Sequence, residues 1–146
     1  MATFGPKDPH KRLADIFSKM KPGQRDVLLG DLEGRDHVAA ARIKLLMFTF
    51  DDLRRIDARG IQELLRRVDH DTLALALKGA KADLAALMFA NMSERAATLL
   101  QDDIEALGPV RTSDVDAARA AVAETAKALS DEGSIVIQDG DDKYVT

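Results

Sequence analysis

Met47-Phe48-Thr49-Phe50 interrupts a chain in which apolar residues otherwise recur at helical spacing almost from end to end. Three large apolar side chains within four residues, followed by two aspartates, indicate a joint between two groups of helices. The alternative is that a helix ends here and its apolar residues fill the core. Only residues 134–137 have a composition that favours a strand. The sequence therefore predicts an all-α fold with a joint at residues 47–50.

Before the joint, residues 1–46 are expected to form three short helices that resemble an α-solenoid unit, behind a flexible N-terminus. The helices are predicted at about residues 10–20 and 24–33, with Asp36 as the N-cap of the third. On the third helix the predicted buried stripe consists of Val38, Ala41, Leu45 and Leu46. Such a unit has too little interior to be very stable alone.

After the joint, residues 51–138 are expected to form a six-helix bundle, followed by a flexible tail at residues 139–146. Asp57, Asp69, Ser93 and Ser113 are the predicted N-caps. On the last helix a 3-4-4-3 spacing predicts one buried stripe, made of Val115, Ala118, Val122, Ala126 and Leu129. Residues 134–137 are predicted to pack against the bundle as a short extended segment.

Composition excludes several functions. The 146 residues include no cysteine, 21 basic and 25 acidic residues, so thiol chemistry is absent and the net charge is -4. That charge argues against nucleic-acid binding. The three histidines are scattered, and catalytic and nucleotide-binding motifs are lacking. We therefore expect no enzyme activity, cofactor or metal, and a cytoplasmic location, because no apolar run is long enough to cross a bilayer.

The helix that begins after Ser93 carries a pattern of its own. At 100° per residue, Arg95 and Asp102 lie within about 20° of each other on one face. The opposite, wide apolar face is predicted to contain Ala96, Leu99, Leu100, Ile104 and Leu107. Asp103 falls at its margin. The charged face either steers a partner of complementary charge or is only a solvated helix surface, and the pattern alone leaves both readings open.

Four segments, in order and at consistent spacing, resemble the FliG family of bacterial flagellar motor switch proteins. The first is Met47-Phe48-Thr49-Phe50, which is similar to the family's Met-Phe-x-Phe hinge. The others are residues 73–80, 91–97 and 102–111, and the resemblance spans roughly residues 13–137. It implies a protein that receives force and performs no catalysis. In this family, charged side chains of the C-terminal helices contact the cytoplasmic loop of the stator subunit MotA.

Carried over to this chain, the resemblance places the stator contacts at Lys78, Arg95, Asp102, Asp103 and Arg111. Lys78 and Arg111 lie outside the charged helix, so tertiary packing must bring them to it. Asp103 keeps the alternative of an internal ion pair or cap, with Arg111 as one partner.

The resemblance also implies that Met47, Phe48, Thr49 and Phe50 form a hinge that reorients the charged helices when rotation reverses. It further implies that residues 1–46 are an armadillo-like unit and that the six-helix bundle has armadillo-like superhelical packing. The armadillo-like unit would dock on a neighbouring FliG subunit through Leu13, Ile16, Phe17, Val27 and Leu28. The alternative is that these residues pack on the third helix.

Further partners follow from the resemblance. The family's N-terminal domain, which binds FliF, and its middle domain, which binds FliM, are not recognisable here. We therefore expect an excised C-terminal fragment, and the alternative is a naturally short homologue. It would be peripheral to the membrane, at the cytoplasmic face of the inner membrane in the flagellar basal body. The alternative from another functional class is a generic armadillo-like interaction scaffold whose charged face is only solvated surface.

Overall fold

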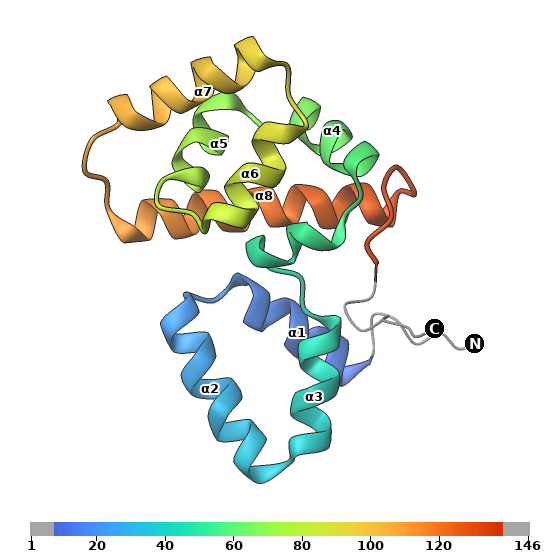
Figure 1. The fold of residues 1–146 in the computed structure, drawn as a ribbon. Helices are drawn as coiled ribbons and strands as arrows, with labels where there is room; N and C mark the ends of the chain where they lie inside the picture. Colours follow the sequence, from blue (N-terminus) through green and yellow to red (C-terminus); the bar gives the residue numbers. More distant parts are fainter. Residues whose placement is uncertain (1–7, 139–146) are drawn as a thin grey trace. The chain divides into compact units, whose positions relative to one another are not determined.

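The computed structural model describes residues 8–138, and the predicted flexible ends, residues 1–7 and 139–146, lie outside the described residues. The described chain is all-α and contains no strand. It divides into two compact units at the bond between Phe48 and Thr49 (Figure 1). Within residues 8–138 no helix has both the length and the apolar character that a bilayer crossing requires.

The first unit consists of α1 (Pro9–Lys19), α2 (Pro22–Arg35) and α3 (His37–Leu46). Asp8 begins α1 by accepting a hydrogen bond from the His10 amide at 3.0 Å. Asp36 begins α3 by accepting one from the Ala39 amide at 3.0 Å, as predicted. Both α1 and α2 pack against α3, which therefore forms the shared wall of this unit.

The core of the first unit is small and differs from the prediction for α3. It contains Ala14, Phe17, Leu29, Ile43 and Met47. The predicted stripe of α3 is wrong except for Leu46, which is partly buried against the core. The buried residues are Ala40 and Ile43, while Val38 and Leu45 are 69% and 64% exposed. Helix α3 is apolar on two opposite faces, so periodicity could not decide which face turns inward. One apolar face remains uncovered within the unit.

The second unit surrounds its longest helix, α8 (Thr112–Asp131). Against α8 pack α4 (Ala58–Arg67), α5 (His70–Leu77) and the 3-10 helix η2 (Phe50–Arg55). α6 (Ala82–Ala90) contacts η2, and α7 (Glu94–Ala106) contacts α5 and α6 (Figure 1). Helix α7 thus lies outside the layer that covers α8.

Helix α8 confirms the predicted stripe and corrects its predicted start. All five stripe residues are buried, namely Val115, Ala118, Val122, Ala126 and Leu129. The capping box at Ser113 is wrong. The helical hydrogen bonds begin earlier, because the Arg111 carbonyl accepts from the Asp114 and Val115 amides at 3.0 and 3.1 Å. Gly133 ends the helix at φ +83°, a conformation that glycine adopts without strain.

The segment after α8 packs against the bundle, as the sequence predicts. Ile135 is buried, and Ile137 forms an isolated antiparallel bridge with Ile56. The Gln138 amide donates to the Arg55 carbonyl at 2.9 Å, and Arg55 Nε donates to the Gln138 carbonyl at 2.7 Å. These bonds fix the end of the described chain beside the end of η2.

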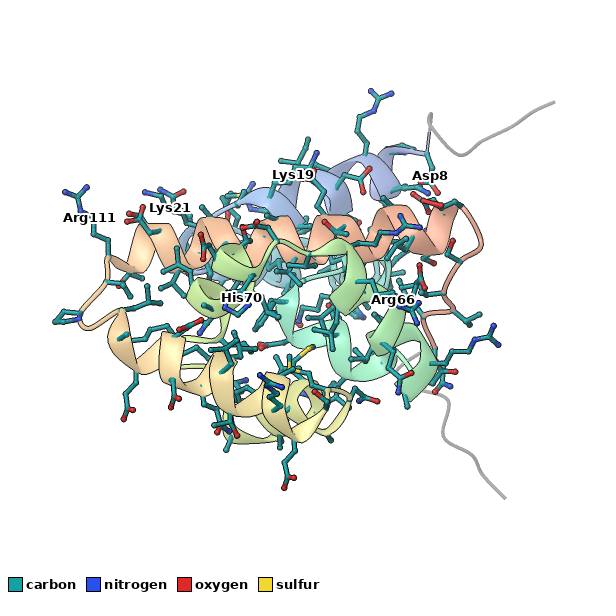
Figure 2. All side chains as sticks on the ribbon, turned by 90° about the horizontal axis from the view of Figure 1, so that it is seen from above. Asp8, Lys19, Lys21, Arg66, His70 and Arg111 are labelled. Carbon is teal, nitrogen blue, oxygen red and sulfur yellow. The ribbon has the colours of Figure 1, made fainter. Side chains whose placement is uncertain are left out.

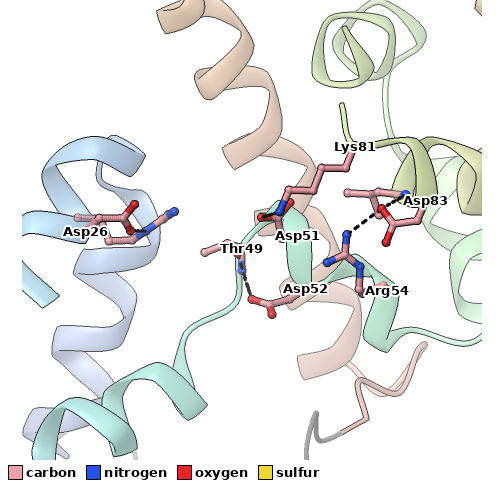
Figure 3. Close-up of polar contacts among 9 residues, drawn as sticks. Asp26, Thr49, Asp51, Asp52, Arg54, Lys81 and Asp83 are labelled. Atoms are coloured by element: carbon pink, nitrogen blue, oxygen red, sulfur yellow. Dashed lines mark hydrogen bonds and ion pairs between the residues drawn. The ribbon is translucent and has the colours of Figure 1, made fainter. Parts of the chain in front are cut away.

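Helix η2 is tied at its start and to α6. The Thr49 amide and hydroxyl both donate to Asp52 Oδ2, at 2.8 and 3.1 Å (Figure 3). Arg54 pairs with Asp83 at 3.3 Å, and Lys81 pairs with Asp51 at 3.5 Å (Figure 3). Exposed pairs of this kind add little stability individually. Together with the cap they fix where η2 begins and which helix it faces.

Candidate functional site: helix α7 and its supports

Helix α7 presents two of the predicted contact charges to solvent. Ser93 begins the helix by accepting a hydrogen bond from the Ala96 amide at 3.1 Å, as predicted. Arg95 and Asp102 are both exposed, and neither forms an ion pair with any residue that the structure describes. Seven residues of helix separate them by about 10 Å along one face. Both charges are therefore available to an outside partner.

The buried side of α7 is narrower than predicted. Only Leu100 is buried, whereas Leu99 and Leu107 are 56% and 39% exposed. A hollow of about 470 Å³ lies among α4, α5 and α7, and Leu65, Leu73 and Leu99 are among its lining residues. The five-residue apolar face predicted from the sequence is therefore too wide: Leu100 is buried and Ile104 is half-buried, whereas Ala96, Leu99 and Leu107 are exposed.

The acidic residues near the end of α7 lower the stability of this helix. Asp102, Asp103 and Glu105 lie within the last five residues of the helix, and its last turn contains no basic residue. A helix C-terminus carries partial negative charge, so each carboxylate in the last turn costs about 0.3–1 kcal/mol. Stability therefore does not explain this acidic cluster.

Asp103 is held by a residue that is distant from it in the sequence. His70 Nε2 lies 2.7 Å from Asp103 Oδ2, and the two side chains are about half exposed. His70 is the first residue of α5, and in Figure 2 it points towards α7. The suggested pairing of Asp103 with Arg111 is absent from the described structure. Nothing in the sequence spacing identifies His70, because 33 residues separate the partners.

Lys78 supports α7 from the opposite end of α5. It is half-buried, and its Nζ donates to the Ile104 carbonyl at 3.3 Å. A cation placed on the last carbonyls of a helix opposes their partial negative charge. Lys78 therefore stabilises the acidic end of α7. The side chains at the two ends of α5, His70 and Lys78, contact consecutive residues of α7, Asp103 and Ile104.

Arg111 lies in the turn that joins α7 to α8. Its backbone begins α8, and its side chain is exposed and extends away from the helices (Figure 2). Like Arg95, it has no ion pair within residues 8–138. Three of the five predicted charges are thus exposed, namely Arg95, Asp102 and Arg111. The other two, Lys78 and Asp103, take part in contacts between α5 and α7.

The four residues of the predicted hinge are divided between the two units. Met47 belongs to the core of the first unit, and the Phe48 amide donates to Ser18 Oγ at 3.2 Å. Thr49 and Phe50 begin the second unit through the cap of η2. The boundary between the units therefore falls at the centre of the quartet.

The predicted subunit interface in the first unit is mostly exposed. Leu13, Ile16, Val27 and Leu28 are exposed, with Val27 at 70%. Phe17 differs from these four, because its ring is buried in the core of its own unit, which favours the alternative that it packs there. Val38 and Leu45, which the helical spacing predicts to be buried, are exposed as well.

Comparison with known proteins identifies the family. The FliG C-terminal domain family matches residues 30–137. The chain belongs to this family. FliG proteins of known sequence include "Flagellar motor switch protein FliG" of Vibrio cholerae, which is 39% identical over 135 residues and matches 92% of this chain. The FliG of Pseudomonas aeruginosa is 42% identical over 127 residues, or 87% of this chain.

The chain spans about two fifths of the length of these FliG relatives, 39% and 38% respectively. Solved FliG structures agree with the fold. A crystal structure of FliG residues 86–343 from H. pylori superposes with a TM-score of 0.68 and 34% identity. The match covers 86% of this chain and 59% of the H. pylori chain. Full-length FliG from Aquifex aeolicus covers 88% of this chain and 40% of its own with a TM-score of 0.61 and 35% identity. The generic scaffold is accordingly not favoured.

Proposed function

We propose that this chain is the force-receiving part of a flagellar motor rotor, working at the cytoplasmic face of the inner membrane through contacts rather than catalysis. The observation that carries the proposal is the exposed, unpaired placement of Arg95 and Asp102 on α7 among residues 8–138 of a FliG-family chain. Charges without internal partners steer complementary surfaces and contribute little to stability.

The partner of α7 in this proposal is the cytoplasmic loop of the stator subunit MotA. Arg95 and Asp102 contact it directly, and Arg111 extends the charged surface beyond the end of the helix. Asp103 is oriented by His70, and Lys78 holds the end of α7 while its charge adds to the local field. Because α7 carries one arginine and four carboxylates, the matching surface must be mainly basic with at least one acidic group.

The first unit serves assembly in this proposal. Its exposed apolar residues would stack on a neighbouring FliG subunit in the ring, and the support is that their side chains are exposed by 37% to 70%. The residue set is Leu13, Ile16, Val27 and Leu28, extended by Val38 and Leu45. FliM joins the same complex, whereas FliF contacts belong to a part of the family that this chain does not match. Residues 47–50 act as the hinge through which rotation direction changes.

Charge reversal in a chimaera tests the proposal. The chain replaces the matched region of the Pseudomonas aeruginosa FliG, and Arg95→Glu and Asp102→Lys are introduced singly. We expect each to slow or stop rotation of tethered cells while flagellar filaments still assemble. Matched controls are Arg59→Glu on α4 and Asp131→Lys on α8, which reverse exposed charges without ion pairs in the described structure.

The outcomes separate cleanly. Normal rotation in both α7 variants contradicts the proposal, and so does equal loss of rotation in the controls, because charge at any surface site would then matter. Failure of the unmodified chimaera to rotate, with filaments assembled, counts against the proposal as well.

A further inference from the structure

Arg119 of α8 makes three contacts with one guanidinium. Its Nε donates to the Ala76 carbonyl at 2.7 Å, and a terminal nitrogen donates to the Lys78 carbonyl at 2.9 Å. Its central carbon lies 5.3 Å from the centre of the Phe50 ring. The side chain is half-buried. A planar guanidinium can donate along its edge and stack through its face at the same time, whereas an ammonium group has neither the planar fork nor the flat face.

The two hydrogen bonds close the C-terminal end of α5. The last four carbonyls of a helix have no partner within it, and Ala76 lies in the last turn of α5. Lys78 is the residue that follows the helix. A cation at this position satisfies the free carbonyls and opposes the helix dipole. Arg119 therefore fixes the backbone from which the Lys78 side chain departs.

The contact with Phe50 joins this end of α5 to η2. Phe50 is the first residue of η2 and the last of the predicted hinge quartet. Lys78 in turn donates to the Ile104 carbonyl near the end of α7. The contacts thus form a continuous series from Phe50 through Arg119 and Lys78 to Ile104, all within the second unit.

We propose that Arg119 is a positioning residue that transmits a change at Phe50 to the end of α7. Its relevance to rotation rests on the proposed function, but the coupling itself is a property of the chain. Because the guanidinium contacts both the Phe50 ring and the Lys78 carbonyl, a displaced ring alters the hydrogen bonds that fix the backbone of Lys78, whose side chain holds the end of α7. Spatial continuity alone does not establish coupling, so the decisive measurement is non-additivity between the two positions.

A double-mutant cycle on the 146-residue chain measures this coupling. Phe50→Leu is made with Arg119 present and in the Arg119→Gln background. The readout is hydrogen exchange of the Leu107 and Gly108 amides, which donate to the Ile104 and Glu105 carbonyls at 3.2 Å. With Arg119 present, Phe50→Leu should speed this exchange by about threefold or more, and in Arg119→Gln it should have almost no effect.

Two further variants keep the test decisive. Arg119→Lys retains the charge but not the fork or the stacking face, so it should fail to restore the coupling even if Arg119→Gln is poorly folded. Lys127→Gln removes a half-buried cation from the same helix and should leave the coupling unchanged. Additive effects of Phe50→Leu and Arg119→Gln, or full coupling in Arg119→Lys, overturn the proposal.

Rotation in the chimaera then distinguishes this inference from the proposed function. If the exchange coupling is present, Arg119 positions α7 whatever the motor does. Unchanged switching in Phe50→Leu would then count against the hinge assigned in the proposed function, and not against the role of Arg119.

Discussion

Replacing Gly60 by alanine should destabilise the second unit, although alanine favours helix formation. Gly60 is buried in α4, where an added Cβ would come unacceptably close to Ile56 Cγ2. It would also lie 3.2 Å from Asp57 Oδ1 and 3.4 Å from Ile135 Cβ. Ile56 is 3% exposed and Ile135 is 5% exposed, so neither can move into solvent without losing core contacts.

The expected size follows from three opposing effects. Alanine in place of glycine inside a helix gains about 1 kcal/mol. Overpacking a closed core costs about 1–3 kcal/mol. The added methyl also disturbs the cap, in which Asp57 Oδ1 accepts from the Gly60 amide at 2.9 Å, and loss of such a cap costs about 1 kcal/mol. The net loss in unfolding free energy should be about 1–3 kcal/mol.

Gly30→Ala is the matched control. Gly30 lies inside α2, and a Cβ there would meet nothing within 4 Å. The same chemical change should therefore stabilise the first unit by about 1 kcal/mol. Urea unfolding followed by NMR peaks of each unit separately gives both values, which avoids treating two units as one transition. A neutral or stabilising Gly60→Ala would refute the packing described around Ile56 and Ile135.

Two further predictions concern charges. Arg42 lies 2.9 Å from Asp8, and its hydrogen bond is the main cause that lowers the Asp8 pKa below its ordinary value. The Asp8 carboxylate should thus stabilise the first unit at neutral pH, and this stabilisation should be lost as the pH falls through the lowered pKa. Asp8→Asn should abolish this acid sensitivity, and an ordinary or raised Asp8 pKa in an NMR titration would contradict the prediction. Glu105→Lys should stabilise α7 by about 1 kcal/mol, because it places a cation in the last turn of the helix. An unchanged thermal unfolding temperature would show that charge at the end of α7 has no net effect on stability.

Short-range features were predictable because their causes are local. Asp36, Asp57, Asp69 and Ser93 each cap the helix expected from the sequence, since an N-cap needs only a side-chain oxygen next to the first turn. The stripe of α8 was predictable for a related reason: this helix is apolar on one side only, so its period identifies the buried face.

Features that depend on competition between faces or on distant partners were not predictable. Helix α3 has two apolar faces, and the sequence cannot say which one its own unit covers. The contacts of His70 with Asp103 and of Arg119 with Lys78 span 33 and 41 residues, so no spacing rule connects them. In the candidate site, the exposure of Arg95 and Asp102 followed from the helical period, whereas the residues that hold α7 in place needed the three-dimensional structure.

The attachment of α7 to α5 at two consecutive residues has a mechanical consequence. Asp103 and Ile104 are where His70 and Lys78 hold the helix, and Arg95 lies nine residues away. A sideways push on Arg95 therefore acts on a lever arm of about 13 Å and tends to tilt α7, and the contacts of α7 with α5 and α6, including buried Leu100, resist the tilt. The same push on Asp102, which is next to the attachment at Asp103, has almost no lever arm and is transmitted directly to α5.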